Sequence, residues 1–321
     1  SRLDSTAVDV AARTAVVGPG CRGSELAAEL EAHDLFFPAG HCRGVAVGGY
    51  LLQGGYGWNS RVLGPACESV IGLDVVLADG TLVHCSADEH PDLYWAARGS
   101  GPGFFAVVVA FHLRLHPRPA VCGSSVYVYP VDCAAEVYTW AREIAADVDR
   151  RVEMQIVCSR GIPALGLAEP ALVIASPVFA DSEAEALEAL AVLETCPVRD
   201  CALVAVPFAV TTMPEWYDAV MSNYPSGHRY ATDNMWTHAP AADLVPRLLD
   251  VIADLPPHPA HFLWLTWGPS PARQDMAYSL EDEVYLALYG AWQDEEDDGA
   301  YADWSRSHMA AMADLATGVH L

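Results

Sequence analysis

Seven glycines stand between positions 40 and 57, within the sequence FFPAGHCRGVAVGGYLLQGGYGWNSR. Glycine weakens the interior of helices and strands, so this density requires a physical reason. Apolar residues such as Val45 and Leu51 recur among the glycines, which argues against a flexible linker. Two interpretations are open. The segment is either a tight irregular turn or a stretch of bare main chain whose N–H groups approach a flat or charged ligand.

A β-hairpin is predicted after this segment. Residues 70–78 have the composition of a strand, Asp79 and Gly80 form a two-residue turn, and residues 81–85 return. A second glycine-rich segment, RGSGPGFF at 98–105, leads into the apolar run AVVVAFHLRLH. Because a strand follows it rather than a helix, this segment does not fit a dinucleotide-binding fingerprint. Two glycine segments therefore flank a hairpin.

This order of motifs resembles the second half of the FAD-binding domain of the vanillyl-alcohol-oxidase and p-cresol-methylhydroxylase (PCMH) superfamily, in its berberine-bridge-enzyme-like branch. The motifs that carry the resemblance read AGHCRGVAVGGYLLQGGYG, LDVVLADGTLVHC and PDLYWAARGSGPGFFAVVVAF. The resemblance implies an FAD-dependent oxidase or dehydrogenase. Such an enzyme moves a hydride from a hydroxyl- or amine-bearing small molecule to the flavin, with oxygen as the expected final acceptor.

The resemblance also implies a set of cofactor-binding residues. Cys42 occupies the position at which the family bonds covalently to the flavin ring, and His41 is an alternative attachment point or a neighbour of the thiol. An inert buried thiol is the other interpretation of Cys42. The remaining expected FAD contacts are Gly48, Gly49, Tyr50, Gly54, Gly55 and Gly57 near the pyrophosphate and flavin edge, with Gly101, Gly103 and Val107 near the adenine half.

Tyr56 is the expected catalytic residue, because some relatives place an aromatic residue facing the substrate at this position. A phenol there is able to orient or deprotonate a substrate hydroxyl. Packing of Tyr56 on the cofactor ring is the alternative. Two residues depart from the family pattern: Gln53 stands where many relatives have glycine, and Tyr50 where many have histidine.

The HPRP sequence at 116–119 predicts a domain boundary, because proline interrupts regular strand pairing. We expect an α+β chain with part of a PCMH-type FAD-binding domain at 1–118 and a substrate-binding domain at 119–321. In the second domain, strands alternate with helices, which favours an antiparallel sheet covered by helices on one face. Trp264, Trp267, Tyr285 and Tyr289 are candidates for a substrate wall, and ordinary core packing explains them equally well.

Composition narrows the classes of partner. A formal net charge of −25 argues against nucleic acid and anionic membranes as partners. All 17 basic residues are arginine, which removes Schiff-base lysine chemistry and the lysine of phosphate-binding loops. No run of eighteen apolar residues and no signal-peptide pattern occurs. Nine scattered cysteines indicate reduced thiols, so we expect a cytoplasmic protein that acts on a small molecule.

Several parts of the family pattern are missing from this sequence. The family has an earlier lobe with an Arg-Ser-Gly-Gly-His loop and a later Asn-Tyr pair beside the flavin, and neither is present. The chain is therefore expected to correspond to the middle of a family member. The alternative function is a truncated or non-catalytic relative that acts as a binding module without flavin. No metal site is expected, because His258 and His261, like Cys196 and Cys201, lack partners at ligand spacing.

Overall fold

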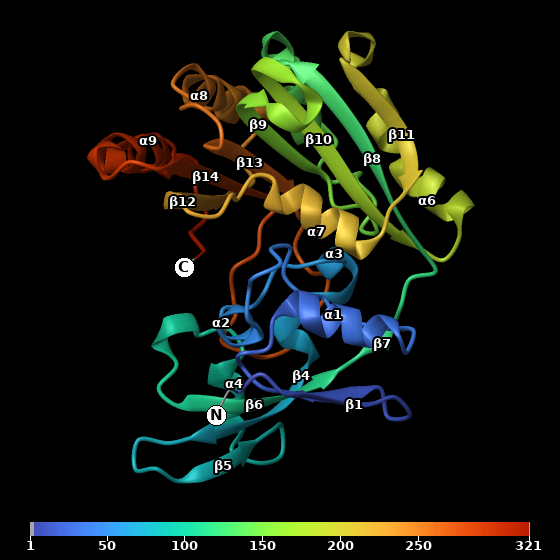
Figure 1. Ribbon diagram of the computed structural model, residues 1–321, viewed down its shortest axis with the longest axis vertical. Coiled ribbons are helices and arrows are strands. Elements are labelled where there is room, and N and C mark those ends of the chain that lie inside the picture. Colours follow the sequence, from blue (N-terminus) through green and yellow to red (C-terminus); the bar gives the residue numbers. More distant parts are fainter. Residues whose placement is uncertain (1–2, 321) are drawn as a thin grey trace. The chain divides into compact units, whose positions relative to one another are not determined.

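The computed structural model describes residues 3–320, which form two compact units (Figure 1). The first unit contains residues 3–119 together with Ser270–Ser279, and the second contains Ala120–Pro269 and Leu280–His320. The chain therefore returns once to the first unit, a feature that a single division at residue 118 does not include. The α+β class expected from the sequence is confirmed.

The first unit is built on a five-stranded antiparallel sheet in the order β1-β2-β6-β4-β5. The strands are β1 (Thr6–Asp9), β2 (Thr14–Val17), β4 (Val70–Val76), β5 (Leu82–Cys85) and β6 (Val107–Arg114). The predicted hairpin is confirmed as β4 and β5, and Gly80 at its turn has φ of 86°. A small second sheet pairs β3 (Leu35–Phe36) with β7 (His116–Pro117).

Four helices belong to this unit: α1 (Gly23–Glu31), α2 (Val47–Leu52), α3 (Ser60–Leu63) and α4 (Pro91–Ala97). Leu26 and Leu30 of α1 are fully buried against the sheet, as the helical spacing predicts. The sequence predicts this helix at 25–33 with Ser24 as its cap, but the helix begins two residues earlier and its N-cap is Arg22. The Ser24 hydroxyl instead donates a hydrogen bond to the carbonyl oxygen of Arg43 at 2.8 Å.

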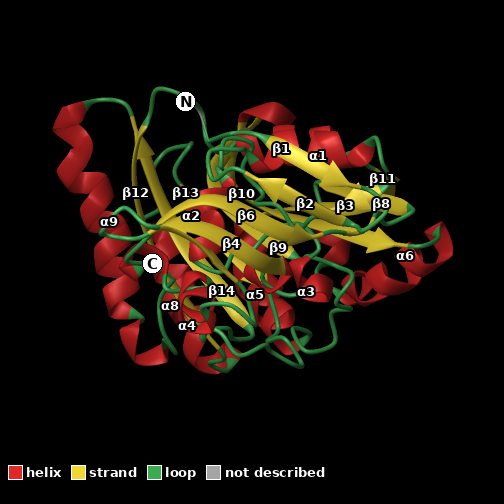
Figure 2. Cartoon of the chain, turned by 90° about the horizontal axis from the view of Figure 1, so that it is seen from below, coloured by secondary structure: helices red, strands yellow, loops and turns green. Residues whose placement is uncertain are grey.

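The second unit contains a seven-stranded, fully antiparallel sheet in the order β11-β8-β10-β9-β13-β14-β12, shown in yellow in Figure 2. Its strands are β8 (Val121–Pro130), β9 (Gln155–Ile162), β10 (Leu167–Ala180), β11 (Val204–Val210), β12 (Arg229–Thr237), β13 (His261–Thr266) and β14 (Val284–Trp292). The sequence predicts strands at 261–267 and 283–292, which are present as β13 and β14, and a strand at 171–175, which is only part of the much longer β10.

One face of this sheet is covered by helices, as the sequence predicts. The covering helices are α5 (Ala134–Glu143), α6 (Glu183–Leu190), α8 (Ala241–Ala253) and α9 (Asp298–Ala311). Their apolar sides form one core with alternate strand residues such as Ile174, Phe262 and Leu286. The sequence predicts Ser182 and Asp132 as helix caps. Ser182 does cap α6, accepting a hydrogen bond from the Glu185 backbone N–H, whereas Asp132 lies one residue before the N-cap of α5, Cys133.

A fifth helix of this unit, α7 (Met213–Met221), was not expected from the sequence. Its Trp216 packs edge-on against Phe179 of β10, with ring centroids 5.0 Å apart. Phe179 alternates with Val178, which lies in the core beneath the four covering helices, so α7 reaches the opposite face of the sheet.

Within residues 3–320, no helix combines the length and the apolar character that crossing a bilayer requires. All nine cysteines are free thiols, and six of them are buried.

Replacing Leu286 by alanine tests the core of the second unit. The side chain is fully buried in β14, so we expect a loss of about 2–5 kcal/mol of unfolding free energy from lost burial and the cavity left behind. The change is measured by urea denaturation followed by circular dichroism. Leu187→Ala, at an exposed position of α6, is the control and is expected to stay within about 0.5 kcal/mol. Equal losses in the two variants would contradict this packing.

Candidate functional site

The first glycine segment folds into a short helix rather than a continuous stretch of bare main chain. Gly48, Gly49 and Tyr50 all lie in α2. The helix packs close to an earlier part of the chain, because the Gly48 N–H donates to the carbonyl oxygen of Pro19 at 3.0 Å. A Cβ on Gly48 would stand 2.9 Å from that same oxygen. Gly48 is therefore explained by helix packing within the protein.

The ring of Tyr50 occupies the space that two later glycines leave open. A Cβ on Gly55 would lie 2.8 Å from the ring, and one on Gly57 would lie 2.2 Å from the Tyr50 oxygen. The Tyr50 hydroxyl donates a hydrogen bond to the carbonyl oxygen of Pro38 at 2.6 Å. The tyrosine that departs from the family pattern thus holds the two ends of the glycine segment together.

Tyr278 joins the two glycine segments. A Cβ on Gly54 would lie 2.5 Å from its ring, and a Cβ on Gly99 would lie 2.3 Å from Tyr278 atoms. Both glycines have positive φ, 99° and 117°, which other residues rarely adopt. Gly101 similarly faces the side chain of Gln53 at 2.9 Å. Sequence reasoning missed Tyr278, because it lies far along the chain and has no motif around it.

The segment that carries Tyr278, Ser270–Ser279, is fixed to the first unit by polar contacts. The Arg98 guanidinium donates to the Gln274 side-chain oxygen at 2.8 Å and to the carbonyl oxygen of Asp275 at 2.7 Å. The Trp95 indole N–H donates to the Asp275 carboxylate at 2.8 Å. The Tyr278 N–H donates to the carbonyl oxygen of Arg98 at 2.9 Å. We call Ser270–Ser279 the strap.

The predicted catalytic residue, Tyr56, lies beside the strap. Its ring meets Tyr278 edge-on, with centroids 5.8 Å apart and planes inclined at 67°. Cys67 and Met276 complete this small cluster, with their sulfur atoms 3.6 Å apart. Tyr56 is only partly buried, so its side chain keeps access to its surroundings.

The Cys42 thiol is held in its protonated form. Burial raises its pKa to about 11, and no opposing cause lowers it. The nucleophilic form of cysteine is the thiolate, so the described surroundings do not activate Cys42. The neighbouring His41 ring packs edge-on against the buried Trp58, with centroids 4.3 Å apart.

Two of the predicted cofactor-binding glycines face open space. A Cβ on Gly49 or on Gly103 would meet no atom within 4 Å. Val107, the last of the predicted cofactor residues, begins β6 and has a side chain that is 63% exposed. The buried hydroxyls of Ser100, in the second glycine segment, and of Tyr278, on the strap, have no hydrogen-bond partner among the described residues. Buried polar atoms without partners are uncommon in folded proteins and require an explanation.

Comparison with known proteins identifies the family of this chain. A protein-family model described as an FAD-binding domain matches residues 1–86. The FAD-linked oxidoreductase nodO of Hypoxylon pulicicidum is 34% identical over 309 residues, which cover 94% of this chain and 67% of that protein. The FAD-linked oxidoreductase ptmO of Penicillium ochrochloron is 33% identical over 292 residues, covering 90% of this chain and 64% of that protein.

The chain belongs to the FAD-linked oxidoreductases. The berberine-bridge-enzyme-like protein 1 of Physcomitrella patens has the same fold, with a TM-score of 0.83 at 17% identity over 99% of this chain and 71% of that one. The resemblance to the PCMH-type superfamily is thus confirmed, and FAD is the cofactor of the family. The chain spans about two thirds of the length of these curated relatives.

The residues of this FAD-linked oxidoreductase fit the cofactor at the two glycine segments. FAD presents phosphate oxygens and a flat ring, and these need hydrogen-bond donors and main chain without side-chain cover. Gly49 and Gly103 offer the bare main chain, and the unpartnered hydroxyls of Ser100 and Tyr278 offer donors. The other predicted glycines, from Gly54 to Gly57 and at Gly101, make room for Tyr50, Tyr278 and Gln53.

Alanine substitutions distinguish glycines that make room for a side chain of the protein from glycines that face open space. Gly57→Ala places a methyl group 2.2 Å from the oxygens of Ala39 and Tyr50, so we expect a loss of about 1–3 kcal/mol of stability from overpacking. Gly49→Ala lies in a helix and meets open space, so we expect no loss and a gain of up to about 1 kcal/mol. Thermal unfolding of the flavin-free protein measures both. Destabilisation by Gly49→Ala equal to that by Gly57→Ala would contradict this assignment.

The reactivity of Cys42 is expected to depend on pH in a defined way. Its folded-state pKa of about 11 exceeds the ordinary value of 9.0, so the thiolate appears, and the stability contributed by the buried thiol is lost, as pH rises from 9 through 11. Alkylation with iodoacetamide, resolved by peptide mass spectrometry, measures this in the flavin-free protein. The exposed Cys201 reports reagent access. Rapid labelling of Cys42 at pH 7 would overturn the expectation.

Proposed function

We propose that this protein, with FAD bound, oxidises a small molecule at a carbon that bears a hydroxyl or an amine. A hydride leaves the substrate for the flavin, and molecular oxygen accepts the electrons afterwards. The observation that carries the proposal is the meeting of the two glycine segments at Tyr278, with two buried hydroxyls left unpartnered. Identity of 34% to an FAD-linked oxidoreductase supports the same reaction class.

The first unit supplies the cofactor-holding residues. When bound, FAD supplies the redox chemistry that no side chain provides, accepting a hydride and releasing the electrons to an acceptor. The Ser100 and Tyr278 hydroxyls would donate hydrogen bonds to its polar groups, and Gly49 and Gly103 would allow close approach of the main chain. Cys42 is the proposed covalent attachment point. Its thiol must first lose a proton that burial retains, so covalent attachment requires a change in its surroundings.

The second unit supplies a substrate-facing surface on the side of its sheet opposite the four covering helices. Tyr285 and Tyr289 alternate with the core residues Leu286 and Leu288, so they project from that opposite face. Tyr289 stacks on His261 with centroids 4.7 Å apart. Flat aromatic surfaces of this kind suit a sugar or an aromatic ring, which they contact over a large apolar area.

His261 is held neutral within this aromatic surface. Burial lowers its pKa to about 4, despite a hydrogen bond to the carbonyl oxygen of Pro259. A carbonyl only accepts, so Nδ1 carries the proton, and the Nε2 atom accepts from the Tyr224 hydroxyl at 3.3 Å. His261 and Tyr224 therefore position the Tyr289 ring, and His261 does not act as a proton donor or acceptor for the substrate at neutral pH.

Tyr56 remains the proposed catalytic residue. Its phenol orients the substrate hydroxyl or removes its proton as the hydride leaves, which is the work of a general base. Its edge-on packing against Tyr278 sets the direction of the ring.

Reconstitution with FAD tests this function. We expect a yellow protein whose absorbance bleaches anaerobically with a substrate from a panel of sugars and aromatic alcohols and returns with oxygen. Tyr56→Phe should retain the yellow colour and lower kcat by about 10²–10⁴-fold, the usual contribution of acid–base catalysis. Tyr301→Phe is the matched control, because Tyr301 lies in α9, where its ring stacks on Trp292 of β14, and it has no proposed role in the reaction.

A further variant tests the proposed contacts between the chain and FAD. Gly49→Ala should weaken FAD binding while the fold stays intact, because the added Cβ would meet no described atom of the chain within 4 Å. A chain that stays colourless after incubation with FAD would reject the proposed oxidase and favour the alternative, a binding module without flavin.

A further inference from the structure

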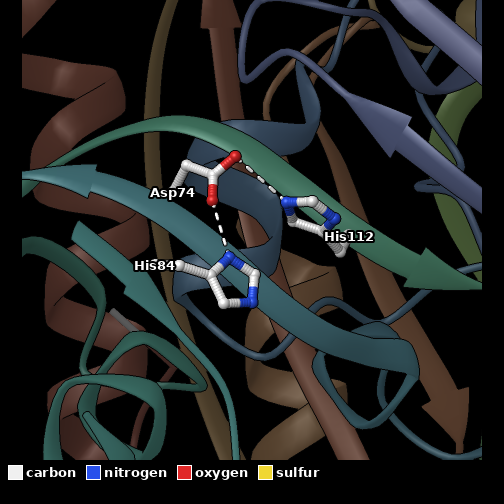
Figure 3. A group of neighbouring side chains, drawn as sticks. All are labelled: Asp74, His84 and His112. Atoms are coloured by element: carbon white, nitrogen blue, oxygen red, sulfur yellow. Dashed lines mark hydrogen bonds and ion pairs between the residues drawn. The ribbon is translucent and has the colours of Figure 1, made fainter. Parts of the chain in front are cut away.

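Three side chains with metal-ligating atoms gather on one face of the first unit's sheet. Asp74 comes from β4, His84 from β5 and His112 from β6 (Figure 3). Each alternates with buried core residues, such as Leu73 and Phe111, so all three project from the face opposite the core. The cluster lies outside the cofactor-holding residues described above.

The register of the strands brings these residues together. Asp74 is the direct partner of His84, and His112 is the direct partner of Gly72, which lies two residues before Asp74. Gly72 leaves room for the imidazole, because a Cβ there would stand 3.1 Å from the His84 ring. A side chain at position 72 would therefore crowd the His84 ring and require it to shift by a few tenths of an ångström.

The three groups point at one another. His84 Nδ1 lies 2.7 Å from one Asp74 carboxylate oxygen, and His112 Nε2 lies 3.0 Å from the other. The two imidazole rings are edge-on, with centroids 5.0 Å apart. One ligand atom from each residue lies within 4.8 Å of the other two. Ligands of a tetrahedral zinc ion stand about 3.3 Å apart, so both imidazoles and the carboxylate must shift for their atoms to converge on one ion, which would replace the two hydrogen bonds.

The charge and exposure of the cluster suit a cation. Both histidine rings make their contacts to the Asp74 carboxylate, a group that ordinarily carries a negative charge at neutral pH. The side chains are 29–40% exposed, which leaves an entry path for an ion. The chain as a whole carries a formal charge of −25, which attracts cations.

We propose that Asp74, His84 and His112 bind one divalent first-row transition-metal ion, with zinc as the reference case, and leave its remaining coordination positions to water. Two imidazole nitrogens select such ions over calcium and magnesium, which prefer oxygen ligands. The ion would connect three adjacent strands. Shifts in pairing register interrupt the β4–β6 pairing on both sides of the cluster, between Val70 and Gly72 and between Asp74 and Val75, so the ion would fix the register between them.

The sequence did not predict this site, because metal-binding motifs are recognised by the spacing of ligand residues along the chain. His84 lies ten positions after Asp74, and His112 lies twenty-eight positions after His84. No spacing rule for zinc motifs covers such a set, because the strand register alone places the three side chains side by side.

Titration of the full chain with zinc tests the proposal without any need for flavin. The protein is treated with chelator, desalted and titrated with Zn²⁺ by calorimetry, and its melting temperature is recorded with and without Zn²⁺. We expect one ion per chain at this site and an upward shift of the melting temperature, because ligands that bind the folded state stabilise it. Ca²⁺ at the same concentration should give no shift.

Variants locate the binding. His112→Asn and Asp74→Asn should weaken Zn²⁺ binding at least about tenfold and remove the thermal shift, whereas His33→Asn, at an exposed position after α1, should change neither. If His112→Asn lowers the melting temperature in the absence of metal, its loss of Zn²⁺ binding could come from a damaged fold. Asp74→Asn keeps the shape of the side chain and then serves as the test of Zn²⁺ binding. Equal Zn²⁺ binding in all three variants, an equal shift with Ca²⁺, or no binding at all would each overturn the proposal.

Discussion

The first unit depends on the burial of one aromatic ring between two glycine segments. Tyr278 contacts the bare Cα positions of Gly54 and Gly99, both at positive φ, where any larger residue would overlap it. The ring arrives on the strap, which returns to this unit after an excursion of 150 residues through the second unit. Arg98 fixes the strap with two hydrogen bonds to it. Closing so long a loop costs conformational entropy, and these contacts offset that cost.

The same ring links the fold to the chemistry. Its hydroxyl, like that of Ser100, is buried without a partner among the described residues, and an unsatisfied buried group costs about 1–3 kcal/mol. A bound cofactor with phosphate or carbonyl oxygens would remove that cost, so part of the binding energy is prepared by the fold itself. The glycines thus have two structural effects. Most of them admit Tyr50 and Tyr278, and the aromatic rings then determine which main-chain surface remains open.

The two faces of the sheet in the second unit carry different kinds of residue. The face beneath α5, α6, α8 and α9 holds the apolar core, with Tyr138 between Phe262 and Trp264. The opposite face carries Tyr224, His261 and Tyr289 in mutual contact, together with Tyr285, whose pKa burial raises well above its ordinary value. Strand alternation produces this division, because neighbouring residues of β14 point to opposite sides.

The sequence by itself determined what local patterns encode. Alternation and turn chemistry identified the β4–β5 hairpin and the strands β13 and β14, and the glycine motifs identified the family. Only the tertiary structure decided what the glycines accommodate, that α2 and α7 are helical, and that Asp74, His84 and His112 converge. The physical reason is the distance along the chain over which each interaction acts. Propensity and periodicity act over a few residues, whereas Tyr278 and the strand register act between residues that only the folded chain brings into contact.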